Sequence, residues 1–176
     1  MTIRNFEDKK PTIATDTYID DTALVIGDVT IGAESSIWPL TVMRGDVNAI
    51  TIGCQTNIQD QSVCHVTHDG PYNPGGFALD IGDRVTIGHR VTLHGCTLGD
   101  NCLIGMDSTI MDGVVIGPYS LIGAGSLLTP GKILEGGYLW MGRPVRKVRK
   151  LGAEEIESIA YSAQQYVRLM KRYIAA

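Results

Sequence analysis

The sequence predicts a mainly β protein, in which a β-helix of hexapeptide repeats is followed by one C-terminal α-helix. Three observations lead to this prediction. Branched aliphatic residues recur at steps of six, glycine often follows them directly, and the end of the chain changes to helical spacing. A sandwich of short strands is the competing all-β architecture, but its strands do not keep a strict six-residue phase.

Length and composition fit one ordered domain, which we expect to cover residues 1–176. The chain is 44% hydrophobic and 19% charged, with a formal net charge of −4. This charge gives no indication of a nucleic-acid partner. The opening segment MTIRNFEDKK lacks the apolar core of a signal peptide, and no stretch reaches the roughly 18 apolar residues of a membrane span. We therefore expect neither a nucleic-acid nor a membrane partner.

The four cysteines form no CxxC pair. We interpret Cys54, Cys64, Cys96 and Cys102 as reduced thiols, used mainly for packing, in a cytoplasmic protein.

The repeat is expected to build coils over about residues 20–133. One aliphatic side chain per hexapeptide should point inward and stack on its equivalents in neighbouring coils, while glycine eases the corner that follows. The inward series is Ile26, Ile31, Ile37, Met43; Ile52, Ile58, Cys64; Ile81, Ile87, Leu93; and Leu98, Ile104, Ile110, Ile116, Ile122, Leu128, with slips of five after Ile26 and after Leu93.

Two insertions interrupt the series. Cys64 and Ile81 are 17 residues apart instead of six, and the surplus contains HDGPYNPGG, which predicts an exposed loop at about 65–80. Met43 and Ile52 are nine residues apart, around RGDVN. Insertions in a solenoid tend to gather on its functional face.

The C-terminal segment predicts an amphipathic helix at about 153–174, laid along the side of the β-helix. Acidic residues suit its start and basic residues its end. Before it, GRPVRKVRK (142–150) is expected to be a solvated exit turn with a basic edge. The apolar stripe consists of Ile156, Ile159, Ala160, Ala163, Val167, Met170 and Ile174.

Two histidines occupy the same place in successive coils. His65 follows the inward Cys64 and His94 follows the inward Leu93, and three hexapeptide steps separate them once the loop is removed. They should lie on one face, about 4.8 Å apart, where both can reach one metal ion. Arg44 takes the equivalent place one coil earlier.

His89 falls on the preceding face, two places after the inward Ile87. Five residues of extended chain, roughly 16 Å, separate it from His94. An ion bound by all three histidines would therefore take His89 from a neighbouring subunit across a symmetric interface. His68, in the mouth of the loop, is expected to be a bystander or part of a water network.

Several motifs resemble the gamma-class carbonic anhydrases: MRGD, TNIQD, VCHVTH, IGHRVTLHG and YSAQQY. The hexapeptide phase is similar to the left-handed parallel β-helix of that superfamily, in which three hexapeptides form one triangular coil. The resemblance implies a homotrimer with a metal ion at each subunit interface. His65 and His94 of one subunit and His89 of the next would be the ligands. Zn²⁺ is the expected ion, and a three-histidine site also suits Fe²⁺ or Co²⁺.

The resemblance also implies an activity, the reversible hydration of carbon dioxide to bicarbonate by a metal-bound hydroxide. Arg44 would pair with acids across the interface, Gln59 would bind the metal-bound water, and Tyr161 would approach from the C-terminal helix. The full set implied around the metal is Arg44, Asp46, Asn57, Gln59, Asp60 and Tyr161.

The chain lacks acidic residues, and one asparagine, that the family pattern has. Val47 stands where the best-known members have a glutamate, the loop at 69–80 carries little acid, and Gln165 replaces an asparagine. We therefore expect slow proton transfer and low activity, with His68 as a candidate substitute shuttle. Two other functions remain open, an acyl-CoA-dependent acyltransferase and a metal-binding trimer without catalysis.

Overall fold

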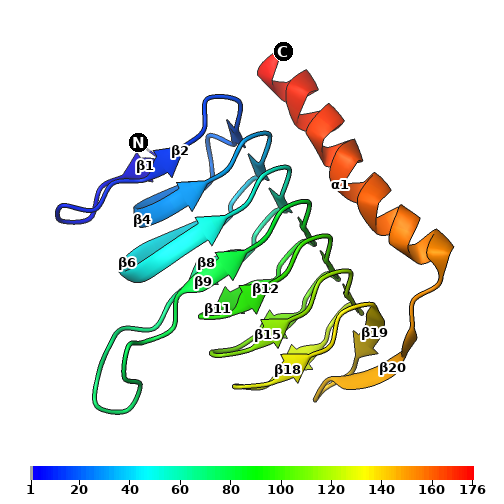
Figure 1. Cartoon of the computed structure of the whole chain (residues 1–176). Helices are drawn as coiled ribbons and strands as arrows, with labels where there is room; N and C mark the ends of the chain where they lie inside the picture. The colour runs from blue at the N-terminus through cyan, green and yellow to red at the C-terminus, as the bar shows by residue number, and fades with distance from the viewer. Residues whose placement is uncertain (1) are drawn as a thin grey trace.

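A three-sided parallel solenoid forms the body of the molecule, as a computed structural model of residues 2–176 describes it (Figure 1). The strands are short because each side of a coil accepts one inward aliphatic and then turns a corner. Corner residues adopt a left-handed backbone, as at Gln61 and Arg90, whose φ angles are 61° and 57°. The predicted β-helix of hexapeptide repeats is confirmed.

Two sides of the solenoid form one 12-stranded sheet, because the long strands β4 and β6 run through a corner and pair on both sides. Its strands are β1 (Ile3–Arg4), β2 (Thr12–Ile13), β4 (Leu24–Ile31), β6 (Val42–Ile52), β8 (Val63–His65), β9 (Leu79–Ile81), β11 (Thr92–His94), β12 (Thr97–Leu98), β14 (Thr109–Ile110), β15 (Val115–Ile116), β17 (Leu127–Leu128) and β18 (Ile133–Leu134).

The third side is an eight-stranded sheet that is parallel except where its last two strands pair antiparallel. Its strands are β3 (Tyr18–Ile19), β5 (Ser36–Ile37), β7 (Asn57–Ile58), β10 (Thr86–Ile87), β13 (Leu103–Ile104), β16 (Leu121–Ile122), β19 (Tyr138–Met141) and β20 (Arg146–Lys150). All five residues of β20 are exposed, as expected for a basic edge, but they form a strand paired with β19 where an exit turn was predicted.

The stacked aliphatic residues form one continuous core, with one correction to the expected phase. Val25 is fully buried and lies in register with Met43, whereas Ile26 is only partly buried and pairs with Arg44. The inward series therefore keeps its step of six between Val25 and Ile31, without the predicted slip. β4 continues through a corner here, so both neighbouring aliphatics looked equivalent in the sequence.

The expected C-terminal helix is present as α1 (Ala153–Ile174), and it packs along the eight-stranded sheet against β3, β5, β7 and β10. It runs back from the end of the solenoid toward its beginning (Figure 1). Trp38 packs against the helix through aromatic contacts: its ring lies 5.5 Å from that of Tyr166 and 5.2 Å from that of Tyr173. Within residues 2–176, no helix combines the length and apolar character that crossing a membrane would need.

The longer insertion forms a protruding hairpin-like loop between β8 and β9 (Figure 1). Bridges join Thr67 to Phe77 and Gly70 to Asn73, so the loop has its own backbone pairing. The shorter insertion lies within β6, which extends to 11 residues. Three cysteines are buried and Cys54 is exposed, and all four are free thiols. Burial raises the pKa of the Cys64 thiol to about 12, which suits a packing role.

Candidate metal centre

The predicted site residues fall into two clusters on different sides of the solenoid. The paired-histidine cluster contains Arg44, Asp46, His65, His94 and Asp112. The His89 cluster contains Asn57, Gln59, Asp60, His89 and Tyr166. Each is built by the register of neighbouring coils.

The paired-histidine cluster arises where parallel strands end side by side. β8 pairs with β11 so that His65 lies directly opposite His94, as the hexapeptide phase predicted. β6 pairs with β8 through Met43 and Cys64, which places Arg44 beside His65. Asp46 follows in the same strand, at the shorter insertion, and its carboxylate contacts His65.

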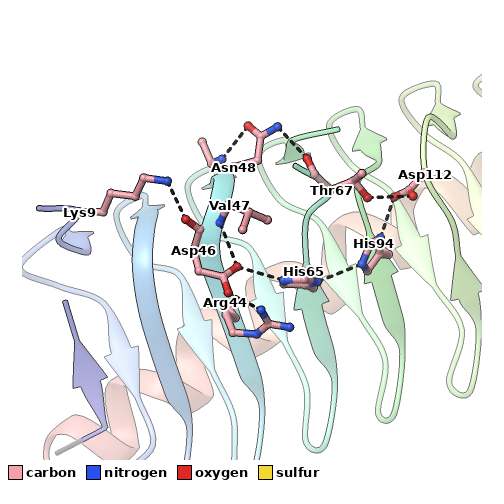
Figure 2. A network of polar contacts seen from close by, with 10 residues as sticks. Lys9, Arg44, Asp46, Val47, Asn48, His65, Thr67, His94 and Asp112 are labelled. Carbon is pink, nitrogen blue, oxygen red and sulfur yellow. Dashed lines mark hydrogen bonds and ion pairs between the residues drawn. The ribbon is translucent and has the colours of Figure 1, made fainter. Parts of the chain in front are cut away.

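A row of polar contacts crosses these strands (Figure 2). Asp46 Oδ1 lies 3.1 Å from His65 Nε2, His65 Nδ1 lies 3.0 Å from His94 Nε2, and His94 Nδ1 lies 2.7 Å from Asp112 Oδ1. Arg44 also bonds the carboxylate of Asp46. Thus each histidine has a carboxylate at one ring nitrogen, and the other ring nitrogens of the two histidines point toward each other.

The donor set of this row fits a cation between the rings. An ionised carboxylate only accepts, so Asp46 takes the proton of His65 Nε2 and Asp112 takes the proton of His94 Nδ1. In the neutral imidazoles, the facing nitrogens then both carry lone pairs and have no proton to share. Nitrogens that bind one tetrahedral ion at 2.0–2.1 Å lie roughly 3.4 Å apart, close to the observed separation. A zinc-type ion or an added proton would satisfy both nitrogens.

The electrostatics of the cluster favour neutral histidine beside ionised aspartate. Burial lowers the pKa of His65, and the charges of Arg44 and His94 act in the same direction against the raising effect of Asp46. For Asp46, burial alone would raise the pKa, but hydrogen bonds from Arg44 and His65 hold it below its usual value. Neutral imidazole is the form that binds metal.

The His89 cluster lies at the corner that follows the third side. β7 pairs with β10 through Ile58 and Ile87, so Asp60 and His89 occupy the same place one coil apart. Asp60 Oδ2 is 2.9 Å from His89 Nδ1, and the two side chains are 41% and 44% exposed. The carboxylate orients the ring and leaves Nε2 available at the surface.

Gln59 and Asn57 lie deeper in this cluster. The Gln59 side-chain amide donates to Asn57 Oδ1 at 3.1 Å, and Asn57 donates to Thr86 Oγ1 at 3.0 Å. Gln59 and His89 line a cavity of about 360 Å³ together with Ser162 and Tyr166 of α1. Burial, followed by the charge of Asp60, raises the pKa of Tyr166. The helix thus closes one wall beside the third predicted ligand.

The structure does not bring all the predicted residues together within one chain. His89 and His94 line different cavities, on different sides of the solenoid. In the part of the chain that the structure describes, no group of three or more His, Cys, Asp or Glu side chains is arranged to hold a metal. Tyr161 is 60% exposed on the outer surface of α1, and His68 is exposed in the loop.

Sequence reasoning missed two residues of these clusters, Asp112 and Tyr166, and one neighbour, Lys9. Asp112 backs His94, Lys9 donates to the backbone oxygen of Asp46 at 2.7 Å, and Tyr166 lines the cavity. Only Asp112 had a usable signal, because it follows His94 by 18 residues, which is one regular coil. Lys9 comes from an N-terminal turn outside the repeat, and no periodicity predicts its contact.

Comparisons with known proteins match this architecture. Models described as bacterial transferase hexapeptide (six repeats) and hexapeptide repeat of succinyl-transferase match residues 95–130 and 79–106. A crystal structure of a hexapeptide transferase family protein from Anaplasma phagocytophilum aligns with a TM-score of 0.89 and 42% identity, covering 98% of each chain.

Relatives found by sequence make the family assignment of this chain more specific. Protein YrdA of Escherichia coli is 49% identical over 98% of this chain and 94% of its own length. A carbonic anhydrase of Geobacillus kaustophilus is 45% identical over 97% and 90%, and gamma carbonic anhydrase 2 of Arabidopsis thaliana is 44% identical over 96% and 60%. The chain belongs to the gamma carbonic anhydrase family. The predicted resemblance is thereby confirmed, and in this gamma carbonic anhydrase relative the two clusters are the candidate halves of a metal centre.

Proposed function

We propose that the protein is a metal-dependent carbonic anhydrase that interconverts carbon dioxide and bicarbonate as a homotrimer. In this proposal a divalent ion lies between His65 and His94 of one subunit and His89 of the next. The relatives named carbonic anhydrase support this activity and imply a metal cofactor. Zn²⁺ is the expected ion, with Fe²⁺ and Co²⁺ as alternatives. A cytoplasmic location remains part of the proposal.

One observation supports the proposal most strongly: the two facing nitrogens of His65 and His94 are 3.0 Å apart, with a carboxylate behind each ring. The arrangement supplies two preoriented ligands and no third from the same cluster. His89 is a suitable third ligand, because Asp60 holds its Nδ1 and its Nε2 is directed away from that contact. Symmetric association would join the two clusters in each interface.

A bound divalent ion would lower the pKa of a coordinated water toward about 7, and so supply a nucleophile for carbon dioxide near neutral pH. The chain's own residues would prepare the site. Asp46 and Asp60 hold the rings of His65 and His89, and Arg44 braces Asp46. Gln59, whose amide is fixed by Asn57, keeps its oxygen as an acceptor to orient an O–H group. Tyr161 is exposed on α1 and available to a neighbouring subunit.

The proposal includes slow proton export. Val47 is 43% exposed and cannot carry a proton. Asp69 of the loop accepts a hydrogen bond from the backbone of Gly75 at 2.6 Å, which commits it to shaping the loop. Low activity is expected for this reason, with His68 as the candidate substitute.

Complementation between two defective variants tests the shared site. His65→Ala and His89→Ala should each lack metal and activity when refolded alone. Refolded together, every mixed trimer should regain one intact interface of its three. Metal content and oxygen-18 exchange from labelled carbon dioxide measure the recovery. Mixed trimers that are verified by mass but recover neither metal nor exchange would overturn the shared site.

An acyl-CoA-dependent acyltransferase is the second candidate function. The matching family models are described as transferases, and the cavity beside α1 could admit an extended ligand. That function needs one histidine base rather than three convergent ligands. Acetyl-CoA protection of the metal-depleted protein against thermal unfolding would favour it. The third candidate, metal binding without catalysis, predicts a full metal complement with no oxygen-18 exchange.

A further inference from the structure

Asp112 lies behind His94 at the end of the polar row, on the coil that follows (Figure 2). β11 pairs with β14 through Leu93 and Ile110, and the chain carries Asp112 two residues further on. Its Oδ1 is 2.7 Å from His94 Nδ1, and its side chain is 28% exposed. This is the shortest of the three contacts along the row.

Both oxygens of Asp112 are used. Oδ2 accepts the hydroxyl of Thr67 at 2.9 Å, while Oδ1 takes His94. Thr67 is itself held by backbone pairing with Phe77 across the base of the loop. A carboxylate fixed at both oxygens cannot rotate away, so it presents one defined acceptor to the imidazole.

The backbone leaves room for this contact at Gly95. A Cβ at Gly95 would lie 2.4 Å from Asp112 Oδ1, and the residue has a φ of +53°, which favours glycine. Glycine directly after His94 therefore lets the carboxylate close on the ring. The contact depends on three separate features: the coil register, the Thr67 hydroxyl and the missing side chain.

We propose that Asp112 is a positioning residue that fixes His94 in its Nδ1–H tautomer. In this tautomer His94 Nε2 carries no proton, and its lone pair is directed at His65. The inference rests on the proposed metal centre and extends it to a residue on the next coil. A neutral histidine side chain free in water prefers the opposite, Nε2–H tautomer, which would place a proton on the nitrogen that must bind the ion. A carboxylate on the far nitrogen reverses this preference.

The tautomer can be measured without metal. We would label the full-length protein with ¹⁵N-histidine, remove metal by chelation, and record long-range ¹H–¹⁵N correlations at a pH where imidazole is neutral. His94 should appear as the Nδ1–H tautomer in the parent protein. Asp112→Ala should shift it toward Nε2–H, and Asp112→Asn, which keeps an oxygen acceptor, should shift it less.

Metal affinity provides the second readout. With Zn²⁺ as the probe, competition against a chelator should give a roughly 10–100-fold loss for Asp112→Ala, the usual cost of losing such a partner. Thr67→Val keeps the carboxylate but removes its donor, so it should give a smaller loss in the same direction. Asp80→Ala is the matched control, because Asp80 is an exposed carboxylate on β9. It should change neither the tautomer nor the affinity.

The outcomes separate this inference from the proposed function. An unchanged His94 tautomer and unchanged Zn²⁺ affinity in folded Asp112→Ala would overturn the role of Asp112. Should that variant fail to fold, an unchanged tautomer and affinity in Thr67→Val and Asp112→Asn would do the same. If the parent protein bound no Zn²⁺ but the His94 tautomer still depended on Asp112, the positioning role of Asp112 would be supported and the proposed metal centre would be wrong.

Discussion

The solenoid has two regions that differ sharply in regularity. Residues 97–134 build strands of two residues each, from β12 to β18, at an almost constant step. Residues 42–96 contain the 11-residue β6 and the protruding loop between β8 and β9. Apart from Asp112 and Tyr166, the residues of both candidate clusters come from the irregular region. The repeat builds the scaffold, and the departures from the repeat supply the polar chemistry.

Polar side chains behave differently in the two regions. In the regular coils, buried hydroxyls bond backbone carbonyls, as Ser120 does to Gly117 at 2.6 Å and Ser108 to Gly123 at 3.3 Å. Around the site, side chains bond other side chains on neighbouring coils, from Asp46 through both histidines to Asp112. The first pattern satisfies the fold internally. The second leaves two acceptor nitrogens facing each other, which is where the proposed metal ion would bind.

The comparison predicts that the largest effect on metal follows a change in the irregular region. His94→Ala removes one of the two facing nitrogens, so the variant should lose nearly all bound metal. Its thermal unfolding after metal removal should match that of the metal-free parent protein, because His94 is 37% exposed and its loss leaves the aliphatic core intact. Elemental analysis and calorimetry measure both quantities. An undiminished metal content in the folded variant would exclude His94 as a ligand.

The opposite result is predicted in the regular region. Ile122 is fully buried, stacked between Ile104 and Trp140. Ile122→Ala should lower the free energy of unfolding by about 2–5 kcal/mol, because it creates a cavity in a packed core. The metal content per folded subunit should stay the same. A loss of metal without a loss of stability would mean that the two regions are not separable in this way.

An effect of intermediate size is predicted for two glycines, one from each region. Gly95 and Gly125 both have positive φ, +53° and +69°, so alanine at either site costs about 1–2 kcal/mol in backbone strain. At Gly125 nothing lies within 4 Å of the added Cβ, whereas at Gly95 it would meet Asp112 Oδ1 at 2.4 Å and Phe77 Cβ at 2.6 Å. Both variants should be destabilised, but only Gly95→Ala should also weaken Zn²⁺ binding. Equal Zn²⁺ affinity in the two variants would contradict the prediction.

The same contrast explains how much could be predicted from the sequence. The coils and the alignment of His65 with His94 follow from a period that the sequence states directly. The inward-facing residue at the start of the solenoid was harder to predict. Val25 and Ile26 are adjacent aliphatics, and only the bend of β4 decides which one points inward. Contacts such as that of Lys9 with Asp46 depend on a turn outside the repeat, so the spacing of residues in the sequence does not predict them.

The residues around His89 show the same limit. Gln59 and Asp60 lie near His89 because all three fall in the repeat, whereas the resemblance implied them only as members of one set around the metal. The choice of tyrosine depends on how α1 rotates against the third side, which helical periodicity fixes only approximately. Tyr166 faces the cavity within one chain and Tyr161 faces outward. The role of Tyr161 therefore stays a prediction about the neighbouring subunit.

The smallest predicted effect concerns proton transfer at the edge of the irregular region. Val47 follows Asp46 on the exposed part of β6 and offers no titratable group, and Asp69 is committed to the loop backbone. If proton export limits the reaction, imidazole buffer should raise the oxygen-18 exchange rate several-fold and then saturate, because a small base can replace a missing shuttle. Val47→Glu should raise the rate in dilute buffer and reduce the response to imidazole, while Val47→Gln, its uncharged counterpart, should change neither. A measurable rate that ignores buffer concentration would show that proton export is not limiting, and Val47 would then be no more than a surface residue beside the site.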